Sequence, residues 1–228
     1  MHDCSGLGPS SSGAPARWAT ELVGRGYVVA MPDSFTPRGV PDGVCTAAPP
    51  RGVDVTPERR ARDAFATLAH LRTLAYVDGR RVGLMGGSHG GTTTLTAMRA
   101  RASEPSPGED RAGFAAAVAL YPRCGNWLRA RPAEAYRPTA PLLILIGDAD
   151  DWTPAADCRR LAQAAPLLSL IVYPGAHHSF DSPNPTRYVP ARINPSSPTG
   201  RGATTGGQPE AWSAAIRDAT SFFAQHLR

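Results

Sequence analysis

Lysine is absent from the sequence, and all 24 basic side chains are arginines. They occur singly or in pairs, such as Arg59-Arg60 and Arg80-Arg81, and form no stripe interleaved with aromatic residues. A nucleic-acid-binding surface usually carries such a stripe, so the net charge of +5 does not indicate a nucleic-acid partner. The sequence also lacks any apolar run near the roughly 18 residues that a membrane span needs, and we expect no membrane partner.

Cysteine is scarce, and its spacing excludes the usual zinc patterns. The four cysteines, Cys4, Cys45, Cys124 and Cys158, form no CxxC pair, so we expect no metal site. If they form disulfide bonds, the protein belongs in an oxidising compartment, periplasmic or secreted; as free thiols they would suit the cytoplasm equally well. Composition alone leaves the localisation open.

The distribution of apolar residues predicts an α/β fold. Short apolar runs alternate with longer amphipathic stretches, which is typical of a mostly parallel central sheet flanked by helices. A length of 228 residues suits one domain, residues 1–228. The predicted strands are Tyr27–Pro32, Arg81–Met85, Ala115–Tyr121, Pro141–Gly147 and Leu168–Tyr173. The predicted helices are Ala16–Gly24, Pro57–Leu74, His89–Arg101, Ala155–Ala164 and Pro209–Leu227. The stretches Ser103–Asp110 and Asp181–Gln208 lack periodicity and are predicted to be loops, the second long enough to fold over a site.

The clearest functional pattern is Gly-x-Ser-x-Gly, centred on Ser88. An apolar strand precedes it and a helical pattern follows it, which is the context of a nucleophile elbow. In that turn bulky residues at Gly86 and Gly90 would collide, and the serine hydroxyl is exposed above the sheet. We therefore predict that Ser88 is a catalytic nucleophile.

A serine nucleophile needs a general base and a carboxylate that orients it, in the chain order Ser, acid, His. The acid candidates Asp148, Asp150 and Asp151 follow one predicted strand. The base candidates His177 and His178 follow the next strand, so both groups lie at the sheet edge that carries Ser88. We favour Asp150 and His178, with the neighbouring residues as alternatives.

The tetrahedral intermediate also needs two donors for its oxyanion. The backbone amide of His89, at the start of the helix after Ser88, is the first candidate. The second donor of such folds comes from the loop after an early strand, and residues 2–7 supply the only candidate loop, with the Cys4 amide best placed.

Several stretches together resemble the dienelactone hydrolase family. The stretches are His2–Gly6, Gly26–Val29 with Pro32–Phe35, Gly86–Gly91, Gly147–Asp150 and Gly175–Phe180. The resemblance covers most of the chain and implies a small α/β hydrolase without a large cap domain. It supports Asp150 and His178 through the patterns Gly-x-x-Asp and Gly-Ala-x-His-x-Phe, and it implies that the Cys4 and His89 amides form the oxyanion hole.

The sequence departs from this family in three ways. The founding dienelactone hydrolases use a cysteine nucleophile, whereas this chain has Ser88, which favours ordinary ester hydrolysis. They also carry an arginine shortly after the catalytic histidine that holds the substrate carboxylate; here Phe180-Asp181-Ser182 follows, so a carboxylated lactone is not expected. Arg38 is an alternative anion-binding residue, although a solvated surface arginine is the simpler interpretation. The usual first strands of the fold have no counterpart in the sequence.

The positions of the cysteines after putatively neighbouring elements predict two disulfide bonds. Cys124 follows one strand and Cys158 begins the helix after the next, while Cys4 and Cys45 follow neighbouring strands; we predict the pairs Cys4–Cys45 and Cys124–Cys158.

The predicted activity is hydrolysis of small or medium carboxylic esters through an acyl-enzyme on Ser88. Trp152, Trp127 and Asp3 are the predicted substrate contacts, and the chemistry requires no cofactor. A small-molecule ester is the expected partner, and a homo-oligomer is compatible with the sequence. The alternatives are a peptidase of the oligopeptidase type, which shares Gly-x-Ser-x-Gly-Gly, and a catalytically inactive binding protein of the same fold.

Overall fold

A parallel sheet of four strands forms the centre of the computed structural model, which describes residues 1–100, 113–128 and 136–227. Its strands lie in the order β1 (Gly83–Gly87), β2 (Ala116–Leu120), β3 (Leu142–Gly147) and β4 (Leu168–Tyr173). All residues of β2 and β3 are buried, because helices cover both faces of the sheet. The predicted α/β architecture is confirmed, and four of the five predicted strands are present within a few residues of their expected bounds.

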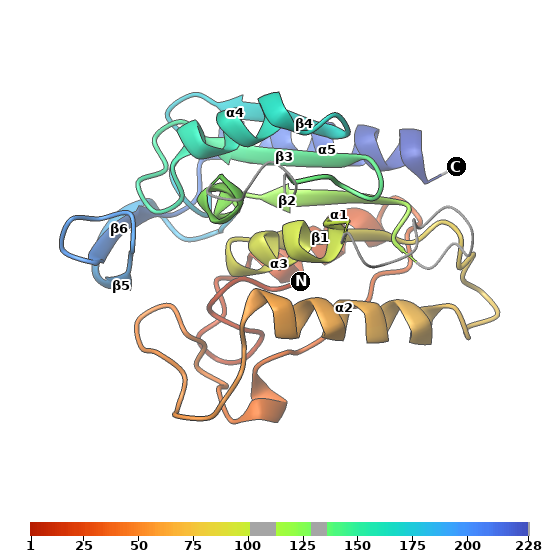
Figure 1. Ribbon diagram of the computed structural model, residues 1–228, viewed down its shortest axis with the longest axis horizontal. Helices are drawn as coiled ribbons and strands as arrows, with labels where there is room; N and C mark the ends of the chain where they lie inside the picture. Colours follow the sequence, from red (N-terminus) through yellow and green to blue (C-terminus); the bar gives the residue numbers. More distant parts are fainter. Residues whose placement is uncertain (101–112, 129–135, 228) are drawn as a thin grey trace.

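Helices cover the sheet on both sides (Figure 1). The helices α3 (His89–Met98) and α4 (Ala155–Ala164) lie in front of it, and α1 (Ala14–Val23) and α5 (Pro209–His226) lie behind it. The helix α2 (Pro57–Leu71) packs against α3. Short 3₁₀ helices occur at Thr36–Arg38 (η1) and Cys124–Trp127 (η2). Within the described ranges, no helix is both long and apolar enough to cross a bilayer.

The first predicted strand, Tyr27–Pro32, is wrong. These residues form no strand, and the backbone of Val28–Met31 makes no hydrogen bond within the described part of the chain. A cavity of about 420 Å³ separates them from β1, and both segments line it. The apolar pattern predicted a strand, but a strand needs a neighbour whose backbone groups form hydrogen bonds with its own N–H and C=O groups. Val28 and Met31 are consequently about half exposed, at 54% and 46%.

Among the described residues, Met1 alone pairs with the outer edge of β1. Its amino group donates to the Met85 carbonyl, and its own carbonyl accepts from the Gly87 amide. This is the hydrogen-bond pattern of one residue in a parallel strand opposite Gly86. The following residues, His2–Gly6, therefore leave the sheet beside the turn that carries Ser88.

A β-hairpin replaces the long loop predicted at 181–208. Its antiparallel strands are β5 (Arg187–Ile193) and β6 (Arg201–Thr205), and they project from the left side of the molecule in Figure 1. The alternation of apolar residues could not reveal β5, because both of its faces are largely exposed. Pro190 lies where the register of the pair shifts, a position at which a strand tolerates proline.

The remaining differences are at element ends. The helix predicted at His89–Arg101 ends at Met98, because Arg99 is extended and forms a β-bridge with Pro138. The predicted loop Ser103–Asp110 lies outside the described residues.

Candidate active site

Ser88 lies at the sharp turn between β1 and α3. Its backbone has φ 53° and ψ −115°, a left-handed conformation that is strained for a residue with a side chain. The Ser88 amide donates to the Leu120 carbonyl of the neighbouring strand at 2.9 Å, which anchors the turn. A Cβ atom at Gly86 would collide with the Gly90 carbonyl, so this position requires glycine. The turn has the geometry of a nucleophile elbow.

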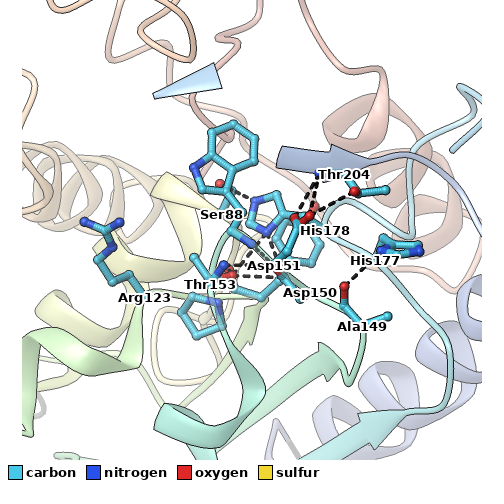
Figure 2. A network of polar contacts seen from close by, with 12 residues as sticks. Ser88, Arg123, Ala149, Asp150, Asp151, Thr153, His177, His178 and Thr204 are labelled. Carbon is cyan, nitrogen blue, oxygen red and sulfur yellow. Dashed lines mark hydrogen bonds and ion pairs between the residues drawn. The ribbon is translucent and has the colours of Figure 1, made fainter. Parts of the chain in front are cut away.

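The structure brings Ser88, His178 and Asp150 together (Figure 2). His178 Nε2 lies 2.8 Å from Ser88 Oγ, and His178 Nδ1 lies 2.8 Å from Asp150 Oδ2. The imidazole and the carboxylate are almost completely buried, with side-chain exposures of 1% and 0%. The arrangement is that of a nucleophile, a base and the carboxylate that orients the base.

The backbone after β3 selects Asp150 from its neighbours. Its Oδ1 accepts hydrogen bonds from the Trp152 and Thr153 amides, at 2.9 and 2.8 Å, so the carboxylate is fixed toward His178. Asp148 instead accepts from the Gly175 amide at 2.6 Å. Asp151 accepts from the amide and hydroxyl of Thr204 on β6. The two alternative acids therefore hold loops in place.

The two adjacent histidines point in different directions (Figure 2). The His177 ring lies with Nδ1 2.9 Å from the Ala149 carbonyl oxygen, away from Ser88. The His178 ring is enclosed by Tyr121 and Trp152, at centroid distances of 4.6 and 4.7 Å. Trp152, one of the predicted substrate contacts, thus lies beside the predicted base.

The loop at residues 2–6 carries the other predicted oxyanion donor. Within the described part of the chain, no hydrogen bond uses the amide of Cys4 or that of His89. The Met1 and His2 carbonyls lie directly against Gly90, where a Cβ atom would collide with both. The loop therefore crosses the first turn of α3, which directly follows Ser88.

Both predicted disulfide bonds are present. Cys4 is bonded to Cys45, and Cys124 to Cys158, each pair with a Cα–Cα distance of 5.0 Å. The first bond ties the loop that contains the Cys4 amide to a second loop. No group of three or more metal-ligating side chains occurs among the residues that the structure describes.

Comparison with known proteins assigns the chain to a family. The family model of the dienelactone hydrolases matches residues 2–227. The chain belongs to the dienelactone hydrolase family. The first residue it matches lies at the start of the loop beside Ser88, and the last lies at the end of α5.

One curated relative of this dienelactone hydrolase family member is the protein named "Probable 2-oxo-3-(5-oxofuran-2-ylidene)propanoate lactonase" from Bradyrhizobium sp. The two are 28% identical over 167 residues, which are 71% of this chain and 65% of the relative. The chain thus spans slightly less than two thirds of that relative's length.

Two solved structures share the fold. A protein assigned to the dienelactone hydrolases from Klebsiella pneumoniae matches with a TM-score of 0.64 and 17% identity, over 98% of this chain and 84% of that one. Esterase 2 of Thermogutta terrifontis, phosphorylated by paraoxon, matches with a TM-score of 0.62 and 19% identity, over 98% of this chain and 80% of that one.

In this dienelactone hydrolase family member, the predicted site residues Asp3, Trp127 and Arg38 each contact other protein side chains or backbone groups. The Asp3 carboxylate accepts from the Ser5 amide and hydroxyl and from the Ser12 hydroxyl, so it orders the loop. Trp127 packs against Tyr136, at a ring distance of 5.4 Å. Arg38, the alternative anion site, forms two hydrogen bonds of 2.7 Å with Asp63.

Two residues that hold the site in place, Thr153 and Asp181, were not predicted from the sequence. Thr153 Oγ1 lies 2.9 Å from Asp150 Oδ2 and 3.1 Å from His178 Nδ1, so it bridges the acid and the base. A threonine three residues after an aspartate is a common turn pattern, and the sequence offered no stronger signal.

The second support is a buried carboxylate below the histidine loop. Asp181 accepts hydrogen bonds of 2.7 Å from the Tyr121 hydroxyl and from Trp18 Nε1. Burial raises the pKa of Asp181 above its usual value. The pair Tyr121 and Asp181 joins the end of β2 to the segment that carries His178, and nothing in the local sequence announces a contact between residues so far apart.

Proposed function

We propose that this chain is a serine hydrolase that cleaves carboxylic esters of small or medium size through an acyl-enzyme on Ser88. The observation that carries the proposal is the continuous hydrogen-bonded chain from Asp150 through His178 to Ser88. Membership of a hydrolase family supports the reaction class.

The proposed reaction has two halves. His178 Nε2 accepts the proton of Ser88 Oγ while the oxygen attacks the ester carbonyl, and His178 then protonates the leaving alcohol. Water repeats the sequence and releases the acid. Asp150 keeps the proton on Nδ1, so that Nε2 is free to act as the base, and it stabilises the imidazolium that forms.

Two free backbone amides favour stabilisation of the intermediate. Those of Cys4 and His89 have no hydrogen-bond partner among the described residues. Donors that are already oriented cost no reorganisation when the oxyanion forms, and one such donor contributes about 2.7–4 kcal/mol in well-studied hydrolases. This supports a turnover-competent site over the inactive binding protein.

The comparisons suggest which compounds to test. A lactone is a cyclic ester, so the reaction named for the Bradyrhizobium relative uses the same chemistry. The Thermogutta esterase is phosphorylated by paraoxon, an organophosphate. We therefore include a simple lactone as a second substrate and an organophosphorus probe.

The decisive experiment combines covalent labelling with turnover. A fluorophosphonate probe should label the wild type and leave Ser88→Ala unlabelled. The His177→Gln variant is the matched control for His178→Gln, because the two rings are adjacent and only one contacts Ser88. Hydrolysis of p-nitrophenyl butyrate should persist in His177→Gln and be lost in His178→Gln.

Each contrary result has a definite meaning. A folded wild type that the probe does not label would show an inactive hydrolase-fold protein. Faster cleavage of an aminoacyl-anilide than of the ester would show a peptidase. Equal activity in Ser88→Ala and the wild type would remove the proposed nucleophile.

A further inference from the structure

The largest fully buried side chain near the proposed site is an arginine. Arg60, in the first turns of α2, has 0% of its surface exposed. None of the ion pairs among the described residues includes it, and its Nε has no hydrogen-bond partner. Burial of a guanidinium away from a carboxylate is unfavourable, and an apolar side chain of similar size would fill the space at less cost. A role beyond packing is therefore indicated.

Arg60 joins the two segments that carry the free amides. Its Nη2 donates to the His2 carbonyl at 2.6 Å, two residues before Cys4. Its Nη1 lies 2.6 Å from His89 Nδ1, on the residue whose amide is the other candidate donor. The guanidinium also lies 4.8 Å from the centroid of the Phe35 ring. That ring forms T-shaped pairs with the rings of His2 and His89, at centroid distances of 4.5 and 5.9 Å.

The protonation states fit these contacts. Burial and the neighbouring Arg60 lower the pKa of His89 to about 3, so its ring is neutral at pH 7 and Nδ1 accepts from the guanidinium. Burial lowers the pKa of Arg60 to about 9, and the side chain stays charged at pH 7. Hydrogen bonds from a charged donor are stronger than those between neutral groups.

We propose that Arg60 is the positioning residue of the oxyanion hole, holding the Cys4 and His89 amides at a fixed separation through the His2 carbonyl and the His89 ring. The inference rests on the proposed function and deepens it. Arg60 itself does not touch the substrate. Donors must be held to within about 0.5 Å to stabilise a transition state, and a rigid fork that bonds both segments provides that constraint.

The test separates positioning from simple stability. In Arg60→Met we expect kcat for p-nitrophenyl butyrate to fall by about 10- to 100-fold, somewhat less than loss of a whole donor, with KM nearly unchanged. Affinity for butylboronic acid, whose serine adduct is tetrahedral and anionic, should fall by a similar factor. Arg60→Lys should be intermediate, because an ammonium replaces the fork by a single point charge.

The matched control is Arg38→Met. Arg38 binds Asp63 on the same helix, so its loss should lower the melting temperature while kcat and boronate affinity stay within twofold of the wild type.

A second pair of variants keeps the inference testable if Arg60→Met does not fold. His89→Gln retains an acceptor for the guanidinium, so its kcat should fall less than that of His89→Leu. His89→Leu removes the acceptor and should lose kcat and boronate affinity together. The backbone amide is present in both.

The outcomes also distinguish this inference from the proposed function. An active wild type with a folded Arg60→Met of unchanged kcat would overturn the positioning role alone, as would equal kcat in His89→Gln and His89→Leu. A wild type without esterase activity or probe labelling would overturn both.

Discussion

At the scale of residues, the imidazole of His178 is held from every side. Tyr121 and Trp152 lie against the ring, Asp150 and Thr153 surround Nδ1, and Ser88 is at Nε2. A ring confined in this way has one orientation and loses little conformational entropy when it acts. Its supporting contacts come from three separate loops, which makes the geometry sensitive to changes that do not touch the substrate.

Asparagine substitutions should distinguish the three aspartates after β3. Asp150→Asn is expected to lower kcat by about 10³- to 10⁴-fold, because an amide no longer enforces the correct tautomer of His178. Asp148→Asn is the matched control, since its partner is the Gly175 amide, and kcat should change less than about tenfold. Steady-state kinetics on p-nitrophenyl butyrate measures both. Similar losses in the two variants would contradict the assignment of Asp150.

The sequence reduced the candidates for this site to a few residues but could not identify each residue of the site. The chain order of Ser88, the aspartate cluster and the histidine pair was readable, because each group follows an apolar run. The choice of Asp150 depends on hydrogen bonds from the two amides that follow it, which no spacing reveals. Arg60 was invisible for the same reason, since its partners lie 58 and 29 residues away.

At the scale of elements, the two disulfide bonds stabilise loops at the edge that carries Ser88. Cys4–Cys45 and Cys124–Cys158 join residues 41 and 34 positions apart, spans so similar that chain entropy predicts nearly equal contributions. Each is expected to contribute on the order of 3–4 kcal/mol to the free energy of unfolding.

Removing each bond should therefore affect stability alike and activity differently. We expect Cys4→Ala/Cys45→Ala and Cys124→Ala/Cys158→Ala to lower the melting temperature by comparable amounts, about 10 °C. Only the first pair should also lower kcat markedly, because it frees the loop that contains the Cys4 amide. Calorimetry and ester kinetics on the two double variants give the comparison. An unchanged melting temperature in both double variants would contradict the stabilising role of the disulfide bonds.

Buried elements were predictable, whereas exposed ones were not. The continuous apolar runs of β2 and β3 have the pattern of strands covered on both faces. Thr56 caps α2 by accepting from the Arg59 amide, as Thr-Pro indicates. The hairpin of β5 and β6 gave no such signal, because its stability comes from backbone pairing and from Asp151. Residues 27–32 had the composition of a strand, but pairing requires a neighbour that composition does not show.

At the scale of the whole molecule, buried histidines make the folded protein sensitive to acid. Burial lowers the pKa of His2 from 6.5 to about 4 and that of His89 to about 3. Over these intervals the unfolded chain binds more protons than the folded chain, so acid favours unfolding.

The free energy of unfolding should accordingly fall as the pH is lowered from 7 toward 4. The expected slope is on the order of 1.4 kcal/mol per pH unit for each histidine. It is fully developed below pH 6.5, where the unfolded form is protonated, and it disappears once the folded form is protonated as well. The raised pKa of Asp181 acts in the opposite direction and moderates the effect. Urea titrations at half-unit intervals measure the slope. His89→Gln should reduce it, and a flat profile would contradict the buried neutral histidines.

The contact between Trp152 and His178 makes Trp152 an intrinsic fluorescent reporter of the site. The centroids of the indole and imidazole rings lie 4.7 Å apart, so a ligand that displaces the imidazole also changes the surroundings of the indole. Binding of butylboronic acid at Ser88 should therefore change the intrinsic fluorescence, and Trp152→Phe should abolish that component while Trp18, Trp127 and Trp212 continue to emit. Occupation of the proposed site can thus be followed spectroscopically, without a substrate and without turnover.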